Sequence, residues 1–165
     1  MDHSAGKIAL GGVLAALSVV VMCLGGLIPI ATFVCPMLCM VLLTLVLRSC
    51  GRRIAWAWYG TVTVLCALLS PDKEAAAVFA FLGYYPILKP KLDGLRLRLL
   101  WKLTLFNAAI GVMYAVLIHL LGMEQIMAEY QELGAALTVV MLFLGNITFL
   151  LMDRVLSLFS VQKKE

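Results

Sequence analysis

Long apolar runs follow one another along almost the whole chain, and short stretches with charges, glycines or prolines separate them. Hydropathy, helix breakers and charges together divide the chain into six apolar segments, residues 8–28, 30–47, 54–69, 75–88, 99–121 and 135–158. An α-helix needs about 20 mainly apolar residues to cross the hydrocarbon core of a bilayer. The pattern therefore predicts an all-α integral membrane protein, with six transmembrane helices in a single membrane domain over residues 1–165.

The fourth segment, residues 75–88, is short for a crossing. As a helix it reaches about 21 Å, against roughly 30 Å of hydrocarbon. We therefore expect it to be shielded by neighbouring helices, to be locally extended, or to border an aqueous cavity. The stretch before it is typical of a helix start, with Ser70 as the cap, Pro71 at the first helical position and acidic residues near the positive end of the helix dipole.

The charges in the loops predict the orientation of these helices. If both termini are cytoplasmic, twelve of the thirteen cations fall on the cytoplasmic side, and Lys73 is the exception. The outer loops instead contain acidic residues, which are Asp72, Glu74, Glu124, Glu129 and Glu132. Because lysine and arginine in short loops are retained on the cytoplasmic side, we expect a multi-pass protein of the inner (plasma) membrane with both ends inside.

Composition narrows the classes of protein further. Hydrophobic residues make up 64% of the chain and charged residues 13%, with a mean hydropathy of +1.05, whereas an average soluble domain has about 25% charged residues. The net charge of +4 is explained by the basic inner loops. Since no basic and aromatic face of a soluble fold accompanies it, we expect no nucleic-acid partner.

The sequence has no H-E-x-x-H or G-x-S-x-G motif, and Asp153 is the one acidic residue well inside an apolar run. We expect no enzyme activity and no cofactor, and we expect Asp153 to pair with Arg154 or with a residue of the basic loop. The five cysteines form no C-x-x-C pair. Cys35 and Cys39 share a helix face, but both histidines lie far away in sequence, so we expect no metal site.

The stretch 83–102 is a dense basic segment, with five cations and one acidic residue. Leucines 92, 95 and 99 share one helical face, so we expect the segment to lie along the inner membrane surface. The cations expected to contact water or lipid phosphate are Lys89, Lys91, Arg96, Arg98 and Lys102. The aromatic residues that fit an interfacial belt are Trp56, Trp58, Tyr84, Tyr85 and Trp101.

Small residues recur on one face of the first predicted helix, at spacings of four, three and four. They are Ala5, Ala9, Gly12 and Ala16. Three further small residues, Gly11, Ala15 and Ser18, widen this face. Small residues let helices approach closely in a membrane. The face predicts either packing against another helix of the same chain or docking of a separate membrane subunit.

Several polar residues lie in the last apolar segments or at their outer ends. Asn107 and Asn146 each lie about eight residues from a cytoplasmic helix end. Antiparallel neighbours would hold them at similar depth, so an interhelical hydrogen bond of about 0.6–2 kcal/mol is the default expectation, with solute recognition as the alternative. Tyr114 and His119 lie in the outer half of their segment, where they can point into a cavity. Lys73, the outward cation, can contact an anionic solute.

The whole chain resembles the substrate-binding membrane subunits, or S components, of energy-coupling-factor transporters. The resemblance rests on the length, on six helices with both ends inside, and on the small-residue face of the first helix, where the A-x-x-x-A pattern of the family occurs as Ala5 to Ala9. It also rests on the broken segment GGLIPIATFVCP at 25–36 and on LGNITFLLMDRV at 144–155 in the final helix.

The resemblance implies a protein that binds a vitamin or another micronutrient on the outer side, with the first outer loop and helices four to six. The candidate solute-binding residues are then Thr32, Lys73, Tyr114, His119 and Asn146. It also implies that the first helix docks, through Ala5, Ala9, Gly12 and Ala16, onto a transmembrane coupling subunit driven by two ATPase subunits. The energy must come from such partners, because this sequence has no G-x-x-x-x-G-K-[ST] loop that could hold ATP.

The main alternative is a non-transport membrane protein, either a scaffold or a cell-envelope assembly factor, whose small-residue faces serve only for packing. An intramembrane enzyme or a secondary transporter fits the sequence less well. Few charges lie inside the apolar runs, and no internal inverted repeat is visible.

Overall fold

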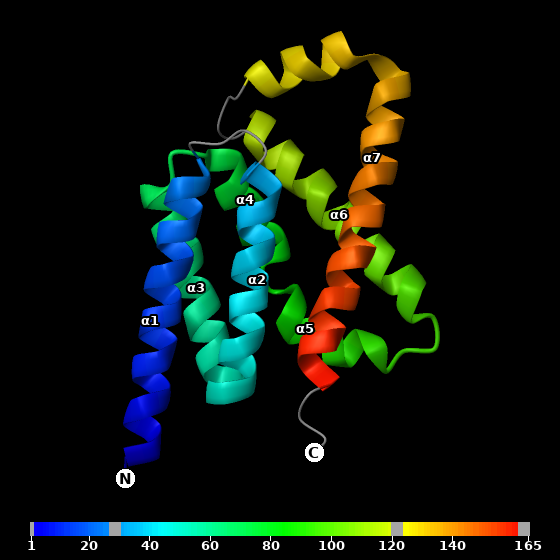
Figure 1. Ribbon diagram of the computed structural model, residues 1–165. Helices are drawn as coiled ribbons and strands as arrows, with labels where there is room; N and C mark the ends of the chain where they lie inside the picture. The colour runs from blue at the N-terminus through cyan, green and yellow to red at the C-terminus, as the bar shows by residue number, and fades with distance from the viewer. Residues whose placement is uncertain (1, 27–30, 120–123, 162–165) are drawn as a thin grey trace.

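The computed structural model describes the backbone of residues 2–26, 31–119 and 124–161, and the side chains of residues 5–26, 31–118 and 139–159. In these ranges all regular elements are α-helices and no strand occurs. The helices are α1 (Asp2–Gly25), α2 (Ala31–Cys50), α3 (Arg52–Leu69), α4 (Lys73–Leu82), α5 (Tyr85–Asp93), α6 (Arg98–His119) and α7 (Glu124–Val161) (Figure 1). The expectation of an all-helical fold is confirmed.

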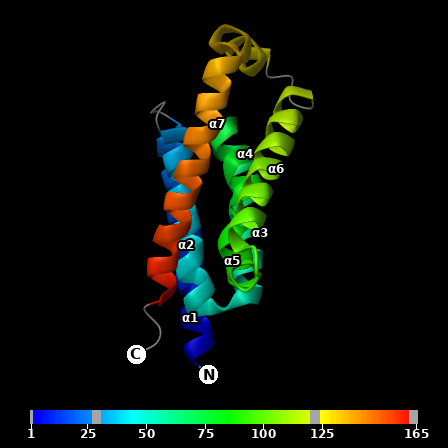
Figure 2. The ribbon, with the colours of Figure 1, turned by 90° about the vertical axis from the view of Figure 1, so that its right-hand side faces the viewer.

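The helices form a bundle with two distinct ends. The start of α1, the junction of α2 with α3, the link from α5 to α6 and the end of α7 all lie at one end, which we call the basic end (Figures 1 and 2). The end of α1, the start of α2, the junction of α3 with α4 and the end of α6 lie at the other end, which we call the Asp72 end. The first part of α7 runs across the Asp72 end before the helix turns along the bundle.

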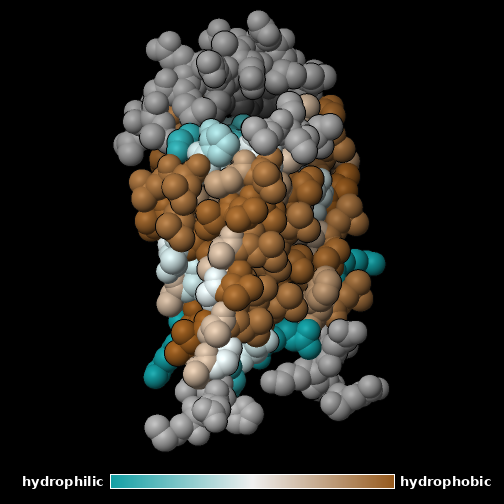
Figure 3. All heavy atoms as spheres, turned by 60° about the vertical axis from the view of Figure 1, so that its left-hand side comes forward, coloured by the Kyte–Doolittle hydropathy of each residue, from teal (hydrophilic) through white to brown (hydrophobic). Residues whose placement is uncertain are grey.

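Four helices in the described part of the chain are long and apolar enough to cross a membrane, with spans at Ala5–Gly25, Ala31–Cys50, Arg98–Ile118 and Val139–Phe159. Exposed apolar side chains cover the middle of the face seen in Figure 3, with more polar residues toward its ends, and α1, α2, α3, α6 and α7 all have exposed apolar side chains, as expected for a surface in contact with lipid. The chain is therefore a membrane protein. The count of six crossings stays a prediction, because α3 has 18 residues beginning with two arginines and α4 and α5 are shorter still.

The expected fourth helix over 75–88 is divided in the structure. α4 ends at Leu82, and α5 begins at Tyr85. Between them Gly83 is tightly packed, because its N–H donates to the carbonyl of Phe79 at 2.7 Å and an added Cβ would lie 2.3 Å from that oxygen. The two short helices together extend from residue 73 to residue 93, so the helical region is longer than the predicted apolar segment 75–88.

The expected cap at Ser70 is wrong. Ser70 ends α3, with an extended backbone and its N–H donating to Cys66 at 2.9 Å. The cap of α4 is Asp72, whose side chain accepts a hydrogen bond from the Ala75 N–H at 2.9 Å. A proline disfavours the helical conformation in the residue before it, so Pro71 separates the two helices and shifts the cap beyond itself.

Two clusters of buried side chains make up the interior. The first joins α1, α2, α3 and α4 around Met22, Leu43, Val62 and Phe79. The second joins α2, α4 and α5 to α6 and α7, and its buried members include Met40, Val78, Tyr85, Phe106, Met113 and Phe149. The rings of Phe106 and Phe149 are stacked, with centroids 4.6 Å apart, so α6 and α7 are held face to face near their middle.

Candidate functional site

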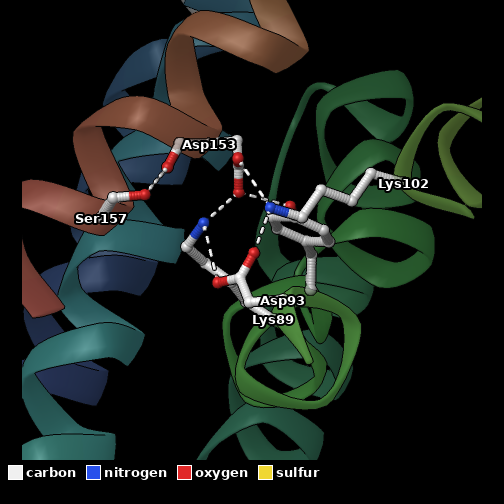
Figure 4. A network of polar contacts seen from close by, with 6 residues as sticks. Lys89, Asp93, Lys102, Asp153 and Ser157 are labelled. Carbon is white, nitrogen blue, oxygen red and sulfur yellow. Dashed lines mark hydrogen bonds and ion pairs between the residues drawn. The ribbon is translucent and has the colours of Figure 1, made fainter. Parts of the chain in front are cut away.

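Five side chains from α5, α6 and α7 meet at the basic end of the bundle. We call Tyr85, Lys89, Asp93, Lys102 and Asp153 the charged cluster (Figure 4). The carboxylate of Asp153 accepts from the Nζ of Lys102 at 2.8 Å, from the Nζ of Lys89, and from the hydroxyl of Tyr85 at 2.5 Å. Asp93 completes the set through ion pairs with Lys89, at 3.5 Å, and with Lys102.

The charged cluster is electrically balanced and largely removed from solvent. The side chains of Lys89 and Lys102 are 7% and 5% exposed and that of Asp153 is 15% exposed, whereas Asp93, at 39%, lies at the solvent-facing edge of the cluster. A buried charge is tolerated only when it is paired and hydrogen-bonded. Two lysines facing two aspartates meet this condition, and the hydroxyl of Tyr85 supplies a further donor to Asp153.

The expectation that Asp153 pairs with a basic-loop residue is confirmed, and Arg154 is not the partner. Arg154 is exposed. It follows Asp153 directly, so it points about 100° away around α7. The backbone carbonyl of Asp153 also accepts from the hydroxyl of Ser157 at 2.8 Å, one turn later. Asp153 thus faces the bundle while Arg154 faces its surface.

Two of the five cations expected at the membrane surface are buried instead. Lys89 and Lys102 lie in the charged cluster, because the carboxylate of Asp153 in the apolar α7 requires opposite charges. The other three, Lys91, Arg96 and Arg98, are exposed. Part of the expected aromatic belt is also interior: Tyr85 belongs to the charged cluster, and the Nε1 of the buried Trp58 donates to the Gly11 carbonyl at 3.0 Å.

Asn107 of α6 and Asn146 of α7 form a second contact between these helices, between the basic end and the Asp72 end. The two amides bond reciprocally, at 2.9 Å and 3.2 Å, and each also donates to a carbonyl four residues earlier in its own helix. The expected interhelical hydrogen bond is confirmed. The Asn146 amide is engaged by Asn107 and lies apart from the Asp72 end.

A polar cluster of a different kind lies at the Asp72 end. The hydroxyl of Thr32 in α2 donates to Asp72 Oδ2 at 2.7 Å, and the hydroxyl of Tyr114 in α6 donates to Glu74 Oε1 at 2.9 Å. Both acidic residues lie at the start of α4. Lys73 lies between them in sequence, and its Nζ donates to the Ala67 carbonyl in the last turn of α3 at 2.9 Å. We call these five residues the Asp72 cluster.

Three of the five predicted solute-binding residues, Thr32, Lys73 and Tyr114, therefore lie in the Asp72 cluster, where each makes a separate contact. Asn146 does not join them. The side chain of His119 lies outside the described side chains. The role of all five in binding a solute stays a prediction.

The small-residue face of α1 is divided by the structure. The four predicted docking residues are all exposed on the outer side of the bundle: Ala5, Ala9, Gly12 and Ala16. Gly11 and Ser18, which were expected to widen this face, are buried and face inward. An added Cβ on Gly12 meets no atom within 4 Å, whereas one on Gly11 meets Ile54 at 4.0 Å. Internal packing of α1 thus uses the Gly11 side of the helix.

Sequence reasoning missed Tyr85 as a partner of Asp153 and Asp93 as a partner of the two buried lysines. It also missed Asp72 and Glu74 as members of the Asp72 cluster. The spacing of four between Lys89 and Asp93 on a helix was a usable signal for their ion pair. Contacts such as Tyr85 with Asp153, which are 68 positions apart, leave no local pattern. The chain was also compared with protein-family models, with curated proteins and with solved structures, and none of the three comparisons found a match.

Proposed function

We propose that this protein is the substrate-binding membrane subunit of an energy-coupling-factor type importer. In this proposal the chain crosses the plasma membrane six times, α4 and α5 together form the fourth crossing, and both termini are cytoplasmic. The basic end is then the inner end and the Asp72 end the outer one. The solute is a vitamin or another small micronutrient that enters from outside.

The observation that carries the proposal is the Asp72 cluster. Its hydroxyls come from α2 and α6 and its carboxylates from the start of α4, and they form two hydrogen-bonded pairs at this end of the bundle. Thr32 and Tyr114 are each 40 positions from the acidic residue they contact. Ligand sites in membrane bundles combine an apolar surround with a few convergent polar groups of this kind. The first part of α7 runs across the same end of the bundle (Figure 1).

The outward face of α1 supports a membrane partner. Four small residues on an exposed helix face allow another transmembrane helix to approach the α1 backbone closely. The Gly11 side of α1 already provides the packing within the chain. In the proposal this outward face meets the transmembrane coupling subunit, and two ATPase subunits bound to that partner supply the energy.

The test is purification of the full tagged chain from membranes of the organism that encodes it, followed by mass spectrometry of the accompanying proteins and of the retained small molecules. We expect one further membrane protein, a pair of ATPases and one enriched small solute. Glu74→Gln with Tyr114→Phe should reduce the retained solute at least tenfold while the protein partners remain. Tyr84→Phe is the matched control, because it removes a tyrosine hydroxyl outside both the Asp72 cluster and the charged cluster.

Repeated purification without ATPases and without solute would contradict the proposal and favour the scaffold alternative. Equal loss of solute in the Tyr84→Phe control would also count against a site at the Asp72 end, because that change lies outside the Asp72 cluster.

A further inference from the structure

A groove between α6 and α7 opens beside the charged cluster at the basic end. Its volume is about 640 Å³. One part of its lining is polar, with three cations, Arg98, Lys102 and Arg154, and the carboxylates of Asp93 and Asp153. The other part is apolar and includes Leu99, Ile147 and Leu151. The groove therefore combines a cationic mouth with a hydrocarbon wall.

The cationic mouth has charge that the protein does not neutralise. Within the charged cluster, the two lysines are balanced by Asp93 and Asp153. Arg98 and Arg154 also line the groove, both are exposed, and neither forms an ion pair with a carboxylate in the described part of the chain. With three cations and two carboxylates in its lining, the groove is net positive. Guanidinium groups bind phosphate oxygens in a bidentate manner.

The apolar wall extends from this mouth toward the middle of the bundle. Ile147 lies seven residues before Arg154 on α7, which places it about 10 Å farther along the helix. Leu99 and Leu151 are 54% and 61% exposed, so the wall is open to the surroundings of the bundle. A phosphate held at the arginines would direct an attached acyl chain along these side chains.

We infer that this groove binds an anionic phospholipid, with its phosphate on Arg98 and Arg154 and an acyl chain against Leu99, Ile147 and Leu151. Charge complementarity and the amphipathic lining identify the occupant, because a soluble phosphate would use only the cationic part. The ion pair of Lys102 with Asp153 joins α6 to α7 beside the groove, and the ion pair of Lys102 with Asp93 joins α6 to α5. The site is independent of the proposed transport function.

The experiment uses the full chain purified in an uncharged detergent and titrated with phosphatidylglycerol, phosphatidylcholine or soluble glycerol phosphate. Native mass spectrometry counts bound lipids, and thermal unfolding gives the shift in Tm. We expect one tightly bound phosphatidylglycerol and a rise in Tm that neither other ligand produces. The double variant R98Q/R154Q should bind phosphatidylglycerol roughly thirtyfold more weakly, since each lost cationic contact costs about fivefold.

Two control variants test whether the loss of lipid binding is specific to the arginines of the groove. R52Q/R53Q removes two exposed arginines at the same end of the bundle but outside the groove, and it should bind the lipid as the wild type does. R98K/R154K retains the charge and should keep most of the binding, which separates lost charge from altered folding. Equal stabilisation by phosphatidylcholine or by glycerol phosphate, or an equal loss in R52Q/R53Q, would overturn the inference.

Discussion

The hydroxyl of Tyr85 donates a hydrogen bond of 2.5 Å to the carboxylate of Asp153, which lies 68 positions later in the chain. The bond joins α5 to α7 and completes the set of donors around the acidic residue inside α7. Because it joins a neutral donor to a charged acceptor, it is stronger than an ordinary hydrogen bond. Removal of this hydroxyl is therefore a direct test of the charged cluster.

Tyr85→Phe should lower the free energy of unfolding by about 1.5–3 kcal/mol, because Asp153 loses a charge-assisted bond in a buried setting. The measurement is unfolding of the full chain in mixed micelles. Tyr84→Phe is the matched control, since it removes the adjacent hydroxyl outside the charged cluster and should change the stability by less than about 0.5 kcal/mol. Equal effects of the two changes would contradict the assigned role of Tyr85.

Replacement of Asp153 by leucine should lower the free energy of unfolding more than Tyr85→Phe does. It leaves two buried lysines with Asp93 as their common partner, and loss of one member of a buried ion pair costs about 3–5 kcal/mol. The double variant Lys102→Met with Asp153→Leu restores the charge balance, because Lys89 keeps Asp93 at 3.5 Å. We expect the double variant to be more stable than Asp153→Leu alone. The opposite order would show that the cluster does not act as a balanced unit.

The contributions of Asn107 and Asn146 to the free energy of unfolding should depend on each other. Asn146→Leu leaves the Asn107 amide without its partner on α7, and we expect a loss of about 0.6–2 kcal/mol. The double variant with Asn107→Leu should lose less than the sum of the two single changes, since each single change breaks the same reciprocal bonds. Thr148→Val, on the exposed side of α7, serves as the control. Strict additivity in the double-mutant cycle would rule out a direct interaction.

Three glycine substitutions in α1 separate packing from docking. Gly11→Leu should destabilise the chain by about 1–3 kcal/mol, because the new side chain is forced against Ile54 on α3. Gly12→Leu meets no atom of the chain within 4 Å of its Cβ, so it should fold normally but lose the copurifying membrane partner. Gly6→Leu, about 120° away around the helix, should do neither. Unfolding of Gly12→Leu would instead show that this face packs internally.

Gly25 is predicted to accept no side chain. A Cβ at this position would lie 2.3 Å from the Sγ of Cys35 in α2, so Gly25→Ala should lower the Tm through steric overlap. Gly111→Ala is the matched change at a helix position with open space, and it should raise stability by about 0.5–1 kcal/mol, because alanine favours the helix. The two changes should therefore have opposite signs in thermal unfolding, and a neutral Gly25→Ala would contradict the close contact.

The sequence by itself determined the class of protein and much of its helical layout. The apolar runs predicted a helical membrane protein, and α1, α2, α6 and α7 are long and apolar enough to span a bilayer. The matched depth of Asn107 and Asn146 predicted their bond. These features follow from local hydropathy and helix geometry, which are properties of contiguous segments.

The tertiary structure alone decided which polar groups contact one another and which face of α1 packs inside the bundle. Charge counting placed Lys89 and Lys102 at the membrane surface, but the carboxylate of Asp153 brings them inside. The small residues of α1 formed one broad face in sequence, and packing of Gly11 against α3 left Gly12 facing outward. The physical reason is that a buried charge or a close helix contact is satisfied by a partner distant in sequence, whose position depends on the packing of the whole bundle.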